Sequence, residues 1–131
     1  MAADKPYEDI PGTWIFDAQR ARLGYHLNQF LYTLMKEANR KAFLADERAY
    51  LENFGLTEAQ REAVLKRDWN RLLELGAVVY ALAKLAFTDG KSYQFMAAQM
   101  TGMTEKEYVA MMLNGGRSPE GWRFKSERRN H

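Results

Sequence analysis

Helix start signals recur along the whole sequence, and strand signals are almost absent. Asp17 is a good N-cap residue, and residues 57–60 (TEAQ) and 104–107 (TEKE) have the pattern of a capping box, in which two side chains bond each other's backbone amides. Asp68 and Ser92 are placed to begin further helices. We therefore expect an all-α protein, a single irregular multihelical domain of about five to seven helices with an extended N-terminal arm.

The expected domain spans residues 1–131 in three parts. Residues 1–16 form the N-terminal arm, 17–118 the helical core and 119–131 a basic C-terminal tail. The basic residues that cluster in this tail are Arg123, Lys125, Arg128 and Arg129. A short charged end of this kind is typically solvated and mobile.

The longest apolar stripe follows Asp17 and predicts one long helix. Its members recur at three- and four-residue spacing: Leu23, Leu27, Phe30, Leu31, Leu34 and Met35. Gly24 interrupts this helix, and a glycine in a helix interior costs about 1 kcal/mol relative to alanine. Either another part of the backbone approaches Gly24 closely, or the helix begins after it.

Two further segments predict helices of different character. Residues 39–54 predict a helix with Gly55 as its C-terminal stop. Residues 77–87 are apolar nearly all round, with Lys84 as the interruption. Because a helix that is hydrophobic on every side is normally buried, we expect 77–87 to be the central and most buried helix.

Composition excludes several classes of function. The net charge is +2, from 19 basic and 17 acidic residues that are interspersed, which does not indicate nucleic-acid binding. No apolar run approaches the roughly 18–20 residues of a membrane helix, and residues 1–12 lack the apolar stretch of a secretory signal. With no cysteine the chain has neither disulfides nor thiolate metal sites, so the cytoplasm is the expected location.

Histidine is too scarce for a metal centre on this chain. The sequence has 2 histidines, His26 and His131, and the second is the final residue. A site with two histidines and a carboxylate would need both. We therefore expect no metal here, no catalytic residue, and a partly buried structural role for His26.

Residues 88–119 contain five of the 7 methionines. Methionine side chains adapt to irregular surfaces, so this segment suits a face that covers a partner or ligand. The residues expected at such an interface are Phe95, Met96, Met100 and Met103.

Tyr93 and Phe95 are two residues apart on a predicted helix, so they point in different directions. One can be buried while the other faces out. An exposed Tyr93 beside Lys91 and Ser92 would combine a ring, a hydroxyl and a cation, which suits an aromatic or anionic ligand.

Five segments, in this order and spacing, resemble the small (alpha) subunit of protocatechuate 4,5-dioxygenase, an extradiol ring-cleaving enzyme. They are residues 9–30, 45–57, 63–76, 79–95 and 100–121. The resemblance implies a multihelical chain that binds no metal and is inactive alone. Its implied partner is a large (beta) subunit that holds non-haem Fe(II) through two histidines and a glutamate. The two subunits would form an alpha2beta2 heterotetramer, with an aromatic catechol substrate at their interface.

The resemblance also implies a role for Tyr93. The matching position carries an aromatic residue that reaches toward the substrate, and in the best known protocatechuate enzymes this residue is phenylalanine. A phenol can form a hydrogen bond that phenylalanine cannot, so protocatechuate, gallate and other catechols remain open as substrates. Lys91 and Ser92 are weaker candidates for substrate contact.

Other functions remain compatible with the residues. A related gallate dioxygenase fuses this domain to the catalytic domain, whereas a separate chain favours the two-subunit arrangement. The chief alternative is a helical protein–protein interaction module with a different partner. A nucleic-acid-binding role for the basic tail lacks a basic recognition helix.

Overall fold

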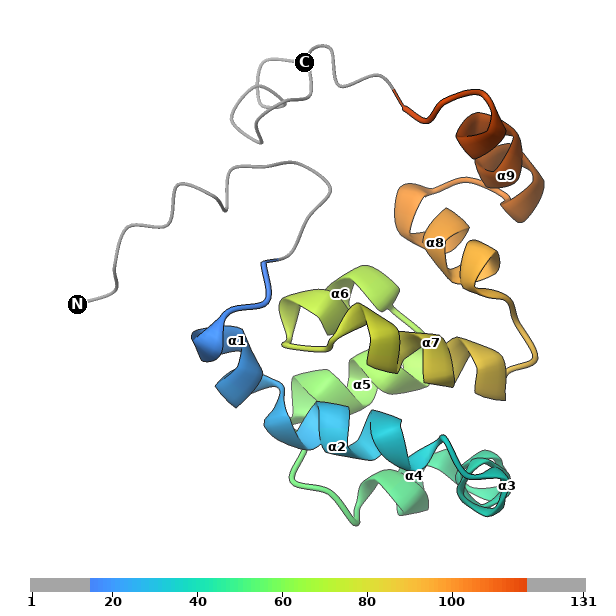
Figure 1. The fold of residues 1–131 in the computed structure, drawn as a ribbon. Helices are drawn as coiled ribbons and strands as arrows, with labels where there is room; N and C mark the ends of the chain where they lie inside the picture. The colour runs from blue at the N-terminus through green and yellow to red at the C-terminus, as the bar shows by residue number, and fades with distance from the viewer. Residues whose placement is uncertain (1–14, 118–131) are drawn as a thin grey trace.

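The computed structural model describes residues 15–117, and this part of the chain forms nine α-helices and no strand (Figure 1). The helices are α1 (Ala18–Leu23), α2 (Tyr25–Thr33), α3 (Glu37–Ala45), α4 (Glu47–Leu51), α5 (Glu58–Lys66), α6 (Trp69–Glu74), α7 (Val79–Thr88), α8 (Tyr93–Thr101) and α9 (Glu105–Leu113). The expected all-α fold is confirmed. Helices outnumber the expectation because two segments predicted as single helices are divided, at Gly24 and Asp46. The expected tail and nearly all of the arm lie outside the described residues.

Several helices begin at the cap residues that the sequence predicted. The Thr57 hydroxyl accepts the Gln60 amide hydrogen at 3.1 Å, and the Gln60 side chain accepts that of Thr57 at 3.0 Å, so the capping box is complete. Thr104 accepts the Glu107 amide hydrogen at 3.1 Å, which is one of the two bonds of the second expected box. The side chains that cap α1, α6 and α8 are those of Asp17, Asp68 and Ser92.

Gly24 ends α1 because another backbone segment crosses it there. A Cβ on Gly24 would overlap the Gly76 carbonyl. Beside this crossing the buried Asn28 side chain donates to Gly76 O at 2.9 Å and accepts from Val78 N at 2.9 Å. Both alternatives expected for Gly24 are therefore found, because another backbone segment approaches it closely and α2 begins directly after it.

Gln60 ties the same crossing to α5. Its side chain is 1% exposed and donates to the carbonyl oxygens of Leu23 and Leu75, both at 3.1 Å. These carbonyls lie at the ends of α1 and α6, where intrahelical partners are missing. One buried amide therefore joins three helices.

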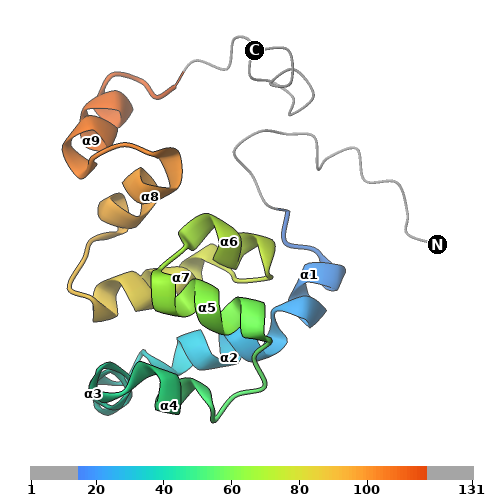
Figure 2. The same cartoon turned by 180° about the vertical axis from the view of Figure 1, so that it is seen from behind.

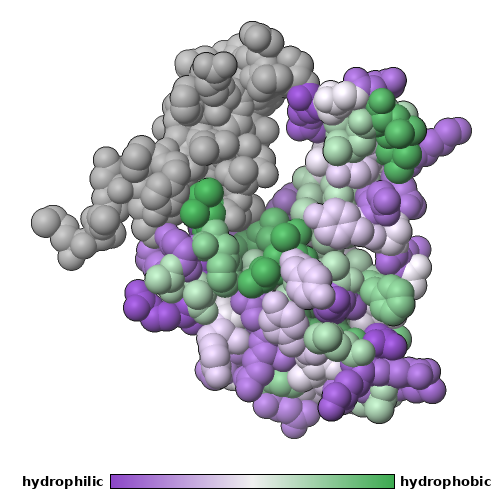
Figure 3. Space-filling model, viewed as in Figure 1, coloured by the Kyte–Doolittle hydropathy of each residue, from purple (hydrophilic) through white to green (hydrophobic). Residues whose placement is uncertain are grey.

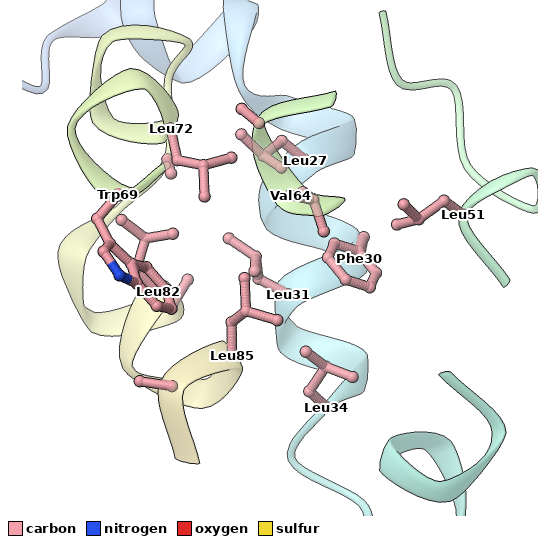
Figure 4. Packing of buried hydrophobic residues seen from close by; sticks show 14 of the residues in the cluster. Leu27, Phe30, Leu31, Leu34, Leu51, Val64, Trp69, Leu72, Leu82 and Leu85 are labelled. Atoms are coloured by element: carbon pink, nitrogen blue, oxygen red, sulfur yellow. The ribbon is translucent and has the colours of Figure 1, made fainter. Parts of the chain in front are cut away.

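The core lies between α2 and α7, with α5 and α6 closing it from behind (Figures 1 and 2). Leu31 of α2 and Leu85 of α7 point toward each other (Figure 4). The predicted stripe supplies Leu27, Phe30, Leu31 and Leu34 to this core, each at most 1% exposed. Leu23 and Met35, which belong to the same expected stripe, are exposed.

Helix α7 is not buried on every side, as residues 77–87 were expected to be. Leu82 and Leu85 are fully buried, whereas Tyr80 is 59% and Phe87 is 66% exposed. Neighbouring helices cover one face only, and apolar residues on the other face contact solvent. Lys84 lies on this open side, with its ammonium 4.2 Å from the centre of the Tyr80 ring.

The predicted helix at 39–54 divides because Asp46 caps a new helix within it, accepting the Ala49 amide hydrogen at 3.2 Å. This second part ends at Leu51, so Gly55 is not its immediate stop. Gly55 instead lies against the ring of His26. His26 is exposed and packs its ring edge-to-face on Tyr25, with 5.1 Å between centroids, so the expected partial burial is wrong.

Helices α8 and α9 pack mainly on each other and extend from the end of α7, away from α3 and α4 (Figures 1 and 2). Helix α9 has no buried residue. Helix α9 is therefore held mainly through α8.

Candidate functional site

The loop from α7 to α8 has a fixed starting point because Arg67 binds its first residue. Arg67 donates to both carboxylate oxygens of Asp89, at 2.7 and 3.0 Å, and to both of Glu47, at 2.9 and 3.0 Å. Burial lowers the pKa of Arg67, but the hydrogen bonds and charges of Asp89 and Glu47 outweigh it and raise that pKa. Bidentate pairs of this kind fix geometry as well as charge.

Arg67 itself has an unusual backbone conformation. Its φ is +52°, the one positive φ outside glycine in residues 15–117. It is the C-cap of α5, and this left-handed turn aims its side chain between α4 and the end of α7. The strain, of order 1 kcal/mol for such a residue, is offset by the two ion pairs.

Ser92 uses its hydroxyl to hold two helices together. It accepts the Phe95 amide hydrogen at 3.0 Å and so caps α8, and it donates to the Glu105 carboxylate at 2.6 Å. Ser92 thereby sets the start of α8 against the start of α9. These two hydrogen bonds account for the Ser92 hydroxyl, which positions the two helices.

The three residues predicted for substrate contact lie at one hollow, which we call the cationic hollow. It has a volume of about 420 Å³ and lies between the end of α2, the exposed side of α7 and the start of α8. Lys91, Ser92 and Tyr93 all line it. Its further lining residues include Leu34, Met35, Arg40, Lys84 and Phe87.

Tyr93 faces out and Phe95 faces partly in, as their spacing allowed. Tyr93 is 53% exposed, whereas Phe95 is half-buried under Lys91, whose ammonium is 5.0 Å from its ring centre. Tyr93 also borders a second hollow, of about 300 Å³, between α8 and α9. Its ring therefore stands on the ridge between two surface depressions.

The expected methionine interface is only partly available. Met96 is 0% exposed and belongs to the chain's own core, so its expected place on an outer face is wrong. Met100 and Met103 are half-buried, and Met100 packs against the core. The exposed apolar side chains here are instead Met112 and Leu113 of α9, where Figure 3 shows a hydrophobic tip.

Sequence reasoning missed three residues of the cationic hollow: Arg40, Lys84 and Phe87. Lys84 carried a signal, because it is the single charge in an apolar run. Phe87 was assigned to the core by the same run. Nothing near Arg40 in the sequence sets it apart, and only the packing of α3 against the end of α2 brings it here.

The described residues do not fit a metal ion. Within 15–117 no group of three or more His, Cys, Asp or Glu side chains is arranged to hold one. Asp89 and Glu47 are both bound to Arg67. Across the same range no helix is long and apolar enough to cross a membrane.

Known proteins resemble this all-α chain in sequence. Residues 27–113 match the family model of the aromatic-ring-opening dioxygenase LigAB, LigA subunit. The chain therefore belongs to this family of small dioxygenase subunits. It is also 29% identical, over 102 residues, to a gallate dioxygenase of Pseudomonas putida. That match covers 78% of this chain but only 30% of the relative's length.

Proposed function

We propose that this chain is the alpha subunit of a two-subunit, Fe(II)-dependent extradiol dioxygenase and acts in the cytoplasm. Its partner is a large (beta) subunit, and the pair forms an alpha2beta2 heterotetramer. The substrate is protocatechuate, cleaved at the 4,5 position, or a related catechol such as gallate. The observation that carries the proposal is family membership over residues 27–113, which include all of the cationic hollow.

The proposed division of labour follows from the side chains. The large subunit holds the non-haem iron, which supplies the activation of catechol and dioxygen. The described part of this chain has no cluster of ligands for a metal. Its contribution is to cover the mouth of the active site, exclude water and hold the substrate ring, with Tyr93 as the contacting residue. Excluding water strengthens the polar interactions inside the closed site.

The surface around Tyr93 has the features that docking requires. Phe87, Tyr80 and Tyr93 are each more than half exposed, and all belong to α7 or the start of α8. Large apolar side chains gathered on one surface are typical of a protein interface. On the α9 side, Met112 and Leu113 extend the same kind of surface.

Co-expression with a large subunit of the same dioxygenase class tests the proposal. We expect the two chains to co-purify and to consume oxygen with protocatechuate or gallate. The present chain alone should bind no stoichiometric Fe(II) and cleave neither substrate. Turnover by the isolated, iron-loaded chain would contradict the proposal, as would failure of the two chains to associate.

A further inference from the structure

We propose that the cationic hollow binds the carboxylate of an aromatic acid. Arg40, Lys84 and Lys91 supply the positive charge, and Phe87 and Tyr93 contact the ring. The inference deepens the proposed function, on which it rests for the class of substrate. It makes this chain the subunit that distinguishes catechol acids from uncharged catechols.

The positive charge around the cationic hollow is not balanced by an acidic lining residue in the described chain. Arg40, Lys84 and Lys91 all line it, and no acidic residue of the described chain does. The acids near these cations have other partners: Glu37 pairs with Lys41, Asp89 with Arg67, and Glu105 accepts a hydrogen bond from Ser92. None of the three cations forms an ion pair with any residue in 15–117. Three like charges around one depression favour an anion.

Arg40 is held so that part of its guanidinium stays available. Its Nη1 donates to the carbonyl oxygens of Leu34 and Met35, at 2.9 and 3.1 Å, which terminate α2. Its central carbon lies 5.6 Å from the centre of the Phe87 ring. Nε and Nη2 make no hydrogen bond within the described residues. These two groups form the fork that pairs with a carboxylate, and fixing Arg40 in advance lowers the entropy cost of binding.

The two lysines are placed by rings rather than by carboxylates. Lys84 lies over Tyr80 and Lys91 over Phe95, at 4.2 and 5.0 Å from the ring centres. A ring restrains the ammonium without neutralising it. Both lysines therefore keep their charge for a ligand in the hollow.

Two exposed rings make the site selective for a flat ligand. Phe87 is 66% and Tyr93 is 53% exposed, and both border the same hollow of about 420 Å³. Aromatic faces left open beside cations suit a ring that carries an anionic group. A carboxylate on a partner protein's side chain would use the charges but not the rings, so it fits these residues less well.

Binding to the full chain, without any large subunit, tests the inference directly. ¹⁵N-labelled protein is titrated with 4-hydroxybenzoate, with the uncharged 4-hydroxybenzamide and with acetate. We expect 4-hydroxybenzoate to shift the amide signals of residues 87–94 and the Nε signal of Arg40. The benzamide and acetate should bind at least tenfold more weakly, since one lacks the charge and the other the ring.

Variants separate the charges. Lys91→Gln and Arg40→Gln should each weaken 4-hydroxybenzoate binding by roughly threefold to tenfold, the range for one partly exposed ionic contact. Lys66→Gln is the control, because Lys66 is an exposed lysine at the end of α5 that does not line the cationic hollow. Within residues 15–117 the Lys91 side chain makes no hydrogen bond, so Lys91→Gln remains informative if Arg40→Gln unfolds.

The outcomes distinguish this inference from the proposed function. No shift near the solubility limit of 4-hydroxybenzoate, or equal binding of the benzamide, would overturn the inference even if an active complex forms. Acetate binding as well as 4-hydroxybenzoate would assign the hollow to a protein carboxylate instead. In an active complex, Lys91→Gln should raise KM for protocatechuate and leave KM for unsubstituted catechol unchanged. If the chain binds 4-hydroxybenzoate as expected but forms no active complex with a large subunit, only the proposed function would be rejected.

Discussion

The Gly76 carbonyl occupies the space that a side chain on Gly24 would need. The two glycines belong to the junctions α1–α2 and α6–α7, which cross in direct backbone contact. Asn28 and Gln60 bond the carbonyl groups around this crossing, so the contact is both close and polar. The crossing fixes how α2 and α7 lie against each other, and the cationic hollow lies at the far ends of these two helices.

Replacing Gly24 with alanine should therefore destabilise the fold strongly. The new methyl group meets backbone that cannot move without breaking the Asn28 bonds, and we expect a loss of about 2–3 kcal/mol in unfolding free energy. Urea denaturation measures it. Gly90→Ala is the control, because a Cβ there meets nothing within 4 Å and only the φ of +74° costs energy, about 1 kcal/mol. Equal losses for the two variants would show that the crossing is not tight.

Arg67→Met should also lower stability, by about 2–4 kcal/mol, because it leaves Glu47 and Asp89 partly buried without their cation. Because the pKa of Arg67 is raised in the folded state, its guanidinium stays charged across the neutral range. The stability that this charge contributes is lost only as the pH rises through the raised pKa. The loss in the variant should thus be present across the neutral range. Arg71→Met is the matched control, since the Arg71–Glu74 pair is exposed and worth little. Similar melting temperatures for both variants in a thermal scan would show that the ion pairs of Arg67 with Glu47 and Asp89 do not stabilise the fold.

Replacing Met96 with alanine should lower stability far more than replacing Met112. Met96→Ala leaves a cavity in the core and should cost about 2–4 kcal/mol. Met112 is 53% exposed, so Met112→Ala should change stability by less than about 0.5 kcal/mol. Peroxide oxidation followed by peptide mass spectrometry gives a second measurement, with Met112 modified first. Rapid oxidation of Met96 in the folded chain would mean that it is accessible after all.

Tyr93→Ala should leave folding nearly intact and impair the reconstituted enzyme. Losing the ring contact is expected to cost about 1–2 kcal/mol, or roughly 5- to 30-fold in kcat/KM. Tyr25→Ala is the control, an exposed tyrosine that does not line the cationic hollow.

Tyr93→Phe removes the hydroxyl alone. If that hydroxyl bonds a ring substituent, the preference between protocatechuate and gallate should shift by about 0.5–1.5 kcal/mol. If the ring only packs, Phe should match the wild type while Ala does not. Wild-type kinetics from both variants would show that Tyr93 does not lie at the active-site mouth. Unfolding of both would show that the fold itself needs Tyr93.

Where most helices begin could be predicted from local sequence. Thr57 with Gln60, and Ser92 with Phe95, form caps within four residues, so nothing distant is needed to satisfy them. The same local logic placed Lys91, Ser92 and Tyr93 together at the start of α8. It also marked Gly24 as a site where either another backbone segment approaches or the helix begins anew, because glycine in a helix interior is unfavourable.

Which apolar side chains are buried depends on how the helices pack, and local sequence did not predict it. Residues 77–87 and 88–112 are apolar or methionine-rich on several sides, so periodicity could not choose the buried face. Packing of α7 against α2 buries Leu85 and leaves Phe87 in solvent, and packing of α8 against α6 and α7 buries Met96. Packing also brings Arg40 to Lys84 and Lys91, more than forty residues away in sequence. Contacts between residues so far apart in sequence depend on how the helices cross. The crossing is set by the fit of two helix surfaces, which no local pattern encodes.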